Sequence, residues 1–494
     1  MTKGPGNSRL VLTLAASLLF SLSLIYFSGF DLVNPVPVSW PAVHATGKSG
    51  PQGYRRLLRQ YPSILTPARL RRLLGLEGRY RLTHEGRGDT IALVEEPSRL
   101  DMTGIDAFDH RFGLPPPVIS TEYSRSAGQA SAEETLDIEW VHAVAPEARI
   151  AVITLPDTGW PGMPPSLPWL TVARDLARLK PDVASTSVIY NGWEATAALR
   201  QFSLAGADSL FSGPLFAAAG DSGPAATFPG MLPGVIAVGG VSLPGSGGLH
   251  APRPWPGTAG GWDWLSFPKP SYQEGVGRST WRTTPDVAFV AGFPGYAINI
   301  GGVWTAATGA SFAAPILAAL WAAQMPANLT GDQAVALLYR YRGVPGVFTN
   351  PGPGAWSRSA GLGVPDFRRL AALAQVPVAA WPPTRYRGAL YVFLTMVLSV
   401  LVIMAAGLSG GAKGAKALVC GAIIVAGWFS VGPFSSLFTS ADPLSRVLHY
   451  PWAAVLVSVL YAGALTAAPV LVSFSGLPVR LNDWLHRGSR DREQ

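Results

Sequence analysis

The chain has 494 residues, of which 48% are hydrophobic and only 14% are charged, so part of it is expected to be membrane-embedded or unusually apolar. The formal net charge of +8 does not indicate nucleic-acid binding, because the basic residues do not form one Lys/Arg tract with interleaved aromatics. The single cysteine, Cys420, excludes an intrachain disulfide and a cysteine-based zinc site.

The first element in the chain is a charge-free run at 10–27, LVLTLAASLLFSLSLIYF, which follows Lys3 and Arg9. About 20 apolar residues span a bilayer, so the run predicts a membrane anchor. A cleaved signal peptide is the alternative. The nearest small-x-small sequence lies far beyond the apolar run, at 43–45, which favours an uncleaved anchor.

An arginine-rich stretch follows at 54–82, YRRLLRQYPSILTPARLRRLLGLEGRYRL. It could lie on an anionic membrane surface. Charge patterning favours the simpler interpretation, in which these arginines form the solvated face of one or two helices.

The region 51–380 predicts a soluble α/β domain, because short β-branched runs alternate with helical stretches between many Pro and Gly residues. Such alternation is typical of a parallel sheet with helices on both faces. Buried strands are predicted at 90–95, 149–155, 215–219 and 235–238, and helices at 133–144 and 312–324.

Two carboxylates define the first candidate motif, SAEETLDIEWVHAVAPEA. Glu133 and Asp137 are four residues apart, so they share one face of the predicted helix. If solvated they form an ordinary acidic face, but if they are desolvated together one pKa rises and the pair can share a proton. Ser131 and Glu134 fit a capping box at the start of this helix, which gives Glu134 a structural role.

Asp221 follows an apolar strand within AAAGDSGPAATFPG. An aspartate between glycines at a strand end is most often a turn former. In an open α/β sheet, however, strand ends are where sites assemble, and a protonated carboxyl here could donate a hydrogen bond to an oxyanion.

Ser311 lies in TGASFAAPILAALWAAQ, where small residues precede a helix and Pro315 is expected in its first turn. A serine there can be an ordinary N-cap, yet the free N–H groups also suit a nucleophile. A nucleophile needs a base. None of the seven histidines lies in a His-Gly-Thr-His type motif, and His142 is expected to be a packing residue, so a carboxylate is the candidate base.

Three further apolar runs predict membrane spans near the C-terminus. They lie at 389–408, 417–438 and 452–474. Basic loops tend to remain cytoplasmic. With four spans, the basic loop between the second and third spans and the basic tail both lie inside, and the soluble domain lies outside.

Taken together, the three motifs resemble the sedolisin (serine-carboxyl peptidase) family, whose fold is similar to that of subtilisin. Supporting matches are FPGMLPGVIAVGGVSL, TPDVAFVA and AGLGVP, and the similarity covers about 65–375. The resemblance implies Glu133 as base, Asp137 as its partner, Asp221 as oxyanion aspartate and Ser311 as nucleophile. Glu95 matches a strand-end acid that extends this network in some members.

The chain departs from the family pattern in three ways. Only a few tens of residues separate the first predicted span from the catalytic region, so ordinary zymogen activation is in doubt. The family binds calcium near its C-terminal end, but no Asp or Glu occurs between Asp332 and Asp366, and Ser357 replaces one expected aspartate. Calcium needs several oxygen ligands, so that site is expected to be lost or weakened and no cofactor is predicted. The membrane segments are additional.

The predicted fold is therefore α/β, a subtilisin-like parallel sheet with helices on both faces, plus four transmembrane helices. The predicted parts are an anchor and linker at 1–45, an extracytoplasmic sedolisin-like peptidase domain at 46–384, and three spans with a short basic cytoplasmic tail at 385–494.

The sequence predicts a multi-pass protein of the cell membrane, a serine-carboxyl endopeptidase that acts on peptides or proteins through a Ser-Glu-Asp triad, with an acidic optimum. Its expected partners are the substrate and the lipid bilayer, not nucleic acid. Two alternatives remain: a catalytically inactive peptide-binding or sensor domain on a membrane anchor, and a transport component built on the four spans. The near absence of ionisable residues in the spans disfavours transport.

Overall fold

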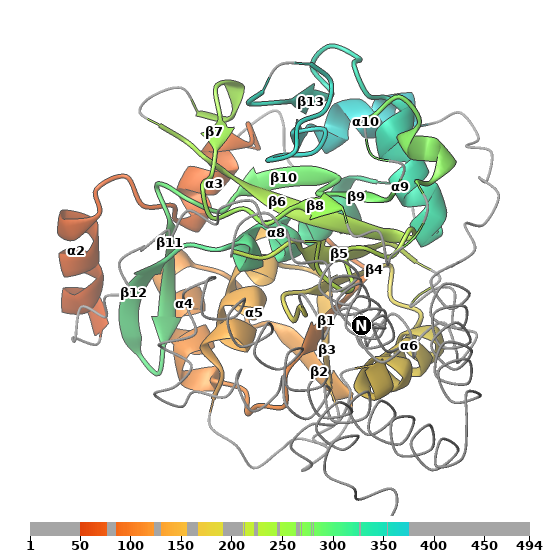
Figure 1. Cartoon of the computed structure of the whole chain (residues 1–494). Helices are drawn as coiled ribbons and strands as arrows, with labels where there is room; N and C mark the ends of the chain where they lie inside the picture. Colours follow the sequence, from red (N-terminus) through yellow and green to blue (C-terminus); the bar gives the residue numbers. More distant parts are fainter. Residues whose placement is uncertain are drawn as a thin grey trace, which may run out of the picture. The chain divides into compact units, whose positions relative to one another are not determined.

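A computed structural model gives the fold of the central part of the chain (Figure 1). The chain divides into two compact units, and all the residues that the structure describes belong to the unit formed by 33–159 and 165–386. The other unit, formed by 1–32, 160–164 and 387–494, contains no described residue. The structure describes residues 50–76, 85–122, 130–155, 166–190, 211, 213–221, 226–244, 248–262, 267, 269–277, 279, 281–325, 328–352 and 354–374.

The centre of the domain is a sheet with the strand order β10-β6-β5-β4-β1-β3-β2, in which all these neighbours are parallel. A short strand, β7, pairs antiparallel with β6. The strands are β1 (Thr90–Glu95), β2 (Val118–Glu122), β3 (Arg149–Thr154), β4 (Val183–Thr186), β5 (Leu215–Ala218), β6 (Val235–Ser242), β7 (Arg253–Pro254) and β10 (Val287–Val290).

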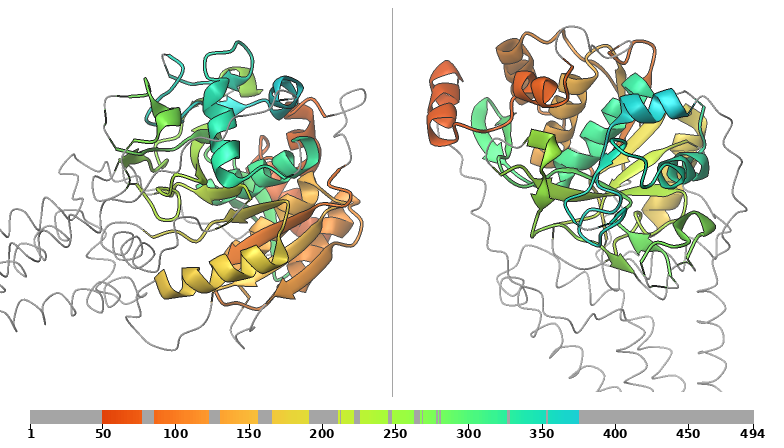
Figure 2. Two further views of the ribbon diagram at one scale, coloured as in Figure 1. Left: turned by 90° about the vertical axis from the view of Figure 1, so that its right-hand side faces the viewer. Right: turned by 90° about the horizontal axis from the view of Figure 1, so that it is seen from above.

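Helices cover both faces of this sheet (Figures 1 and 2). Alternate residues of β1 point to opposite faces: Ile91 and Leu93 join the core that contains α5 and α8, whereas Ala92 and Val94 join the core that contains α6. Because both faces are buried, the middle of the strand, from Ile91 to Val94, is continuously apolar. The larger helices are α4 (Met102–Phe112), α5 (Ala132–Val144), α6 (Ser166–Leu179), α8 (Ala310–Gln324) and α9 (Gly331–Arg340).

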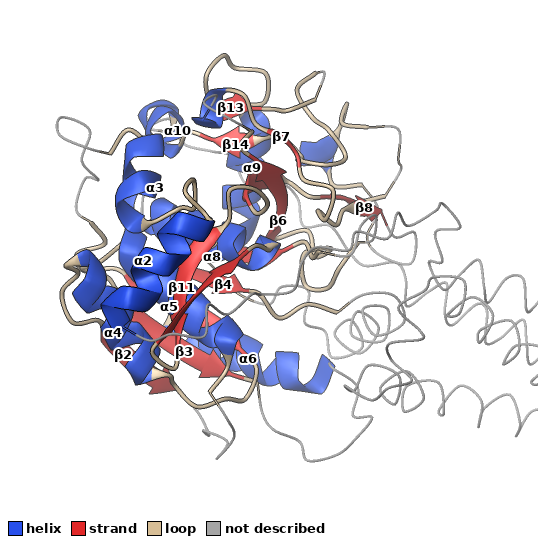
Figure 3. Cartoon of the chain, turned by 90° about the vertical axis from the view of Figure 1, so that its left-hand side faces the viewer, coloured by secondary structure: helices blue, strands red, loops and turns tan. Residues whose placement is uncertain are grey.

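Smaller elements surround these layers (Figure 3). The hairpin of β11 and β12 turns at Gly301 and Gly302, whose φ angles are 58° and 84°. A two-residue hairpin turn with both φ angles positive favours glycine at both positions. The remaining elements are α2 (Gly50–Gln60), α3 (Pro67–Leu73), α10 (Phe367–Leu373), η2 (Gly248–His250), η3 (Ser271–Gln273), β8 (Gly261–Trp262), β9 (Thr283–Thr284), β11 (Tyr296–Ile300), β12 (Val303–Ala307), β13 (Phe348–Thr349) and β14 (Val364–Pro365).

The arginine-rich stretch forms the two short helices α2 and α3. In α2, Tyr54 and Leu57 are buried, whereas Arg55, Arg56 and Arg59 are exposed. This arrangement agrees with the simpler interpretation of the sequence, in which the arginines form a solvated helix face.

The predicted elements of the soluble region are confirmed with small shifts. The first two predicted strands are β1 and β3, and the next two are β5 and β6, of which β6 runs four residues further than predicted, to Ser242. The two predicted helices are α5 and α8, each starting one or two residues earlier than predicted. The parallel sheet with helices on both faces is likewise confirmed.

The prediction of four transmembrane helices needs correction. Among the residues that the structure describes, no helix combines the length and the apolar character needed to cross a bilayer. The longest of them, α8, has 15 residues. At about 1.5 Å per residue it spans roughly 22 Å, less than the hydrocarbon core of about 30 Å. The apolar runs on which the predicted spans were based are outside the described residues. The fold is therefore corrected to an α/β domain, and the prediction of a multi-pass membrane location is withdrawn.

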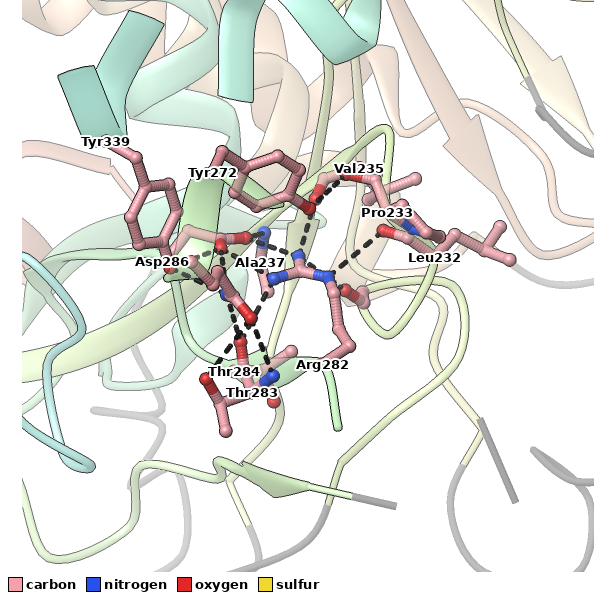
Figure 4. A network of polar contacts seen from close by, with 12 residues as sticks. Leu232, Pro233, Val235, Ala237, Tyr272, Arg282, Thr283, Thr284, Asp286 and Tyr339 are labelled. Carbon is pink, nitrogen blue, oxygen red and sulfur yellow. Dashed lines mark hydrogen bonds and ion pairs between the residues drawn. The ribbon is translucent and has the colours of Figure 1, made fainter. Parts of the chain in front are cut away.

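A buried ion pair joins β6 to the segment before β10 (Figure 4). Arg282 donates hydrogen bonds to both carboxylate oxygens of Asp286, at 2.7 and 2.6 Å, and also to the carbonyls of Gly230 and Val235. Asp286 in turn accepts from the backbone N–H of Ala237 at 2.8 Å. Both charged side chains are fully buried, so this network fixes the path of the chain between two central strands.

Candidate functional site

The N-terminus of α8 presents Ser311. The helix begins at Ala310 with Gly309 as its N-cap, so Ser311 is the second helical residue and the N-cap alternative is wrong. Gly309 has φ 154° and ψ 156°, a region almost restricted to glycine, and a Cβ there would lie 3.0 Å from Oδ2 of Asp221. Glycine is therefore required at position 309, both by the backbone angles there and by the nearby carboxylate of Asp221.

Pro315 lies deeper in α8 than the sequence suggests. It is the sixth residue of the helix and not part of the first turn. A helical N–H normally donates to the carbonyl four residues earlier, which for position 315 is the carbonyl of Ser311. Proline has no N–H, so this carbonyl receives no bond from the helical ladder.

Helix α5 brings the two predicted carboxylates to α8. Ser131 caps the helix by accepting from the N–H groups of Glu133 and Glu134, which confirms the serine half of the predicted capping box. The carboxylate of Glu134 accepts a hydrogen bond from the hydroxyl of buried Ser98, which gives it a structural partner. Glu133 and Asp137 then follow on one face of the helix.

An aromatic cluster fixes α5 against the start of α8. Tyr296 stacks on Phe312, the residue after Ser311, with ring centroids 4.3 Å apart. Trp140 of α5 packs edge-on against Tyr296 at 4.8 Å, and its indole N–H donates to the carbonyl of Ala297. Such packed aromatic pairs restrict relative movement of the two helices that carry the polar residues.

The side chain of Glu133 is half-buried beside Ser311. Burial raises the pKa of Glu133, while hydrogen bonding with the hydroxyls of Ser311 and Ser187 lowers it and the negative charge of Asp221 raises it. One carboxylate oxygen, Oε1, is buried without a hydrogen-bond partner among the described residues. Glu133 is therefore a carboxylate with unused accepting capacity beside a serine hydroxyl.

Asp137 and Glu95 form a buried acidic pair behind Glu133. Burial is the largest cause that raises the pKa of each, and the charge of Glu133 raises both further. A hydrogen bond between the two side chains lowers the pKa of Asp137 and raises that of Glu95. Two adjacent buried carboxyls are expected to hold a shared proton, because both cannot ionise cheaply.

Asp221 lies just beyond the end of β5. Its Oδ1 accepts a hydrogen bond of 2.8 Å from the N–H of Ala310, so it satisfies a free donor at the start of α8. The residue as a whole is exposed, yet burial of its carboxyl raises the pKa of Asp221, against the opposing effect of the Ala310 N–H. A carboxyl with a raised pKa keeps its proton to higher pH than an ordinary aspartate.

We expect the buried acids to make the protein less stable as the pH rises. The folded state raises the pKa of Glu95 above its ordinary value of 4.5. At pH values between the ordinary and the folded-state pKa, the folded state therefore binds more protons than the unfolded state. The free energy of unfolding falls as the pH rises through this range. One such proton contributes up to about 1.4 kcal/mol per pH unit. Glu95→Gln should flatten the decline measured by urea unfolding between pH 4 and 7. Glu96→Gln, at the exposed neighbour, should change the slope much less than Glu95→Gln does; equal slopes in all three proteins would contradict the assignment.

His142 lies away from these residues, as expected of a packing histidine. It is fully buried, and its Nδ1 lies 2.8 Å from Oδ1 of Asp109. His142 is therefore not a candidate base for Ser311.

The loop around Ser357 is held by hydrogen bonds between its own residues. Asn350 uses its amide N–H₂ to donate to the carbonyl of Gly361 at 2.8 Å, and its Oδ1 accepts from the N–H of Gly352. The N–H of Ser357 donates to the same Gly361 carbonyl. Among the described residues there is no cluster of three or more acidic, histidine or cysteine side chains suited to a metal, and calcium sites usually include several carboxylate oxygens. The loss or weakening of the family's calcium site stays a prediction.

The structure brings together all the residues that the sequence singled out: Glu133, Asp137, Asp221 and Ser311, with Glu95 behind them. Their elements converge because the carboxyl ends of parallel strands share one edge of the sheet. Sequence reasoning missed Ser187, which follows β4 and donates to Asp137. Its only signal was the short sequence VAST before it, in which two of four residues are polar and which was not predicted as a strand.

A serine hydroxyl at a helix start, faced by buried carboxyls within a parallel α/β sheet, defines a serine-carboxyl type of site. Known proteins with similar sequence or fold agree with this class. Kumamolisin from Bacillus sp. (strain MN-32) is 32% identical over 272 residues, which represent 48% of this chain and 48% of kumamolisin. The chain thus spans about half the length of this curated relative. No protein-family model matches the chain.

A solved structure shows the fold. Pseudomonas sedolisin, a serine-carboxyl proteinase complexed with two molecules of pseudo-iodotyrostatin, matches with a TM-score of 0.51. Its sequence is 19% identical, and the match covers 63% of this chain and 98% of that chain. The described domain therefore has a sedolisin-like form of the subtilisin-like α/β fold.

Proposed function

We propose that this protein is a serine-carboxyl endopeptidase that hydrolyses peptide bonds of peptide or protein substrates. The observation that carries the proposal is the Glu133 carboxylate, held beside the Ser311 hydroxyl in a buried acidic cluster. A serine needs an adjacent base to attack a carbonyl, and this carboxylate is placed to accept its proton. The likeness to a serine-carboxyl proteinase supports the same assignment.

In the proposed reaction, Oγ of Ser311 attacks the peptide carbonyl while Glu133 accepts the hydroxyl proton. The Asp137–Glu95 pair holds a proton behind Glu133 and keeps its carboxylate oriented. Glu133 then gives its proton to the leaving amine, and a water molecule, activated in the same way, hydrolyses the acyl-enzyme. Asp221, if protonated, donates from Oδ2 to the oxyanion, while its Oδ1 stays bonded to the N–H of Ala310.

The proposed groups predict activity that is highest in mild acid. Glu133 must be ionised to accept a proton, and its raised pKa moves the acidic limb above the position set by an ordinary glutamate. Asp221 must be protonated to donate, and its raised pKa extends the alkaline limb. We therefore expect a bell-shaped dependence of kcat/KM on pH.

The test is digestion of a peptide library by the purified full chain across pH 3–8, beside Ser311→Ala. Cleavage by the unaltered chain that is lost in Ser311→Ala supports the proposal. Cleavage that persists in the variant points to a contaminating peptidase and rejects it. Binding of peptides without any cleavage favours the catalytically inactive peptide-binding alternative.

A further inference from the structure

Ser187 lies in a turn that is fixed by its neighbours. It follows the last residue of β4, Thr186, whose hydroxyl donates to the carbonyl of Val94 in the adjacent strand at 3.0 Å. The same hydroxyl accepts from the N–H of Val188 at 3.1 Å. The residues on both sides of Ser187 are thus tied to one buried side chain, which leaves its own hydroxyl free to serve another group.

The hydroxyl of Ser187 contacts both helices of the site. It donates to Asp137 of α5, at 3.0 Å from Oδ2 and 3.3 Å from Oδ1. It also lies 3.5 Å from the carbonyl of Ser311 in α8, which Pro315 leaves without a helical partner. Hydrogen bonding with Ser187 lowers the pKa of both Glu133 and Asp137.

We propose that Ser187 is a positioning residue whose hydroxyl ties the Asp137 carboxylate to the helix of the nucleophile and so holds Glu133 in line with Ser311. The inference rests on the proposed peptidase function and adds a group to it. In this scheme Ser187 neither attacks the substrate nor transfers a proton. It acts through Asp137, because a single hydroxyl that donates to one carboxylate and lies against a second helix restrains the rotamer of the acid and the spacing of the helices.

The charge balance around this hydroxyl explains why it matters for pH dependence. The titratable groups that act on Glu133, Asp137 and Glu95 come from three parts of the fold: Glu133, Glu134 and Asp137 on α5, Glu95 and Glu96 at and just after the end of β1, and Asp221 after β5. All are acids, so every ionisation is opposed by a neighbour of like charge. A neutral donor such as Ser187 favours the ionised form of the base without adding charge.

Removal of the hydroxyl is therefore expected to change both rate and pH profile. In Ser187→Ala we expect kcat to fall roughly tenfold with KM within about twofold of the unaltered value. The acidic limb of kcat should move up by about one pH unit, because the carboxylates lose a donor to their ionised forms. Ser187→Thr, which restores the hydroxyl, should recover the original limb. Ser185→Ala is the matched control: this buried serine lies in β4, and its hydroxyl has no hydrogen-bond partner among the described residues.

A second measurement tests the contact independently of catalysis. Titration of the Asp137 carboxyl by ¹³C NMR on the purified full chain, assigned with Asp137→Asn, should show a higher pKa in Ser187→Ala and no change in Ser185→Ala. An unchanged titration, or a kcat limb that matches the unaltered chain, overturns the role of Ser187 even if peptidase activity is present. If the unaltered chain cleaves no peptide, the proposed function fails and with it the positioning role, whatever the titration reports about the hydrogen bond.

Discussion

Replacement of Glu133 by glutamine is expected to lower kcat by roughly 10³-fold while KM changes little. Glutamine keeps the size of the side chain and can still contact the hydroxyl of Ser311, but it cannot accept a proton at any accessible pH. Its effect should therefore fall on the chemical step and not on substrate binding. Steady-state kinetics with a chromogenic peptide, measured at the pH optimum of the unaltered chain, checks this expectation.

The matched control for that variant is Glu96→Gln. Glu96 is an exposed glutamate whose negative charge raises the pKa of Glu133. The control should keep most of its activity and move the acidic limb slightly to lower pH. Near-full activity of Glu133→Gln would mean that another group accepts the proton, and the assignment of the base would be abandoned.

The parts of the site that were predicted are those whose signal is local. Glu133 and Asp137 share a helix face at a spacing of four residues, and Ser311 lies two residues after a glycine at a helix start, so short sequence patterns were sufficient. The same is true of β1 and α8, whose apolar runs are continuous. The position of Pro315 was wrong by a turn because the sequence alone does not show which residue begins the helix.

The parts that were missed depend on distant residues. Ser187 follows β4, a strand of four residues that has too little pattern of its own to be recognised. Arg282 and Asp286 are four residues apart, yet their burial comes from β6, η3 and α9, which close around them. The transmembrane prediction was based on hydropathy alone. It is corrected because no helix among the described residues is long and apolar enough to span a bilayer.

The largest expected effect on stability comes from the buried ion pair that joins β6 to the segment before β10. Burial opposes the charge of Arg282, but Asp286 beside it raises the pKa of the guanidinium above its ordinary value, so the pair remains ionised. Arg282→Met removes one partner and leaves the Asp286 carboxylate buried and uncompensated. We expect this variant to lose about 3–5 kcal/mol of unfolding free energy, measured by urea denaturation at pH 6.

The double variant Arg282→Met/Asp286→Asn separates the cost of the unpaired charge from the cost of lost packing. Asparagine is neutral, and its single amide oxygen can still accept from the N–H of Ala237, while its amide N–H₂ can donate to the hydroxyl oxygen of Tyr339; these two groups now donate to separate oxygens of Asp286. If the unpaired charge causes the loss, the double variant should be more stable than Arg282→Met, because the two substitutions act on one interaction and are not additive. Arg253→Met, at an exposed arginine of β7, should change stability by less than about 0.5 kcal/mol. Two outcomes would show that the domain does not depend on this pair to hold its two central strands. In one, Arg282→Met loses no more unfolding free energy than this control; in the other, the double variant is less stable than Arg282→Met.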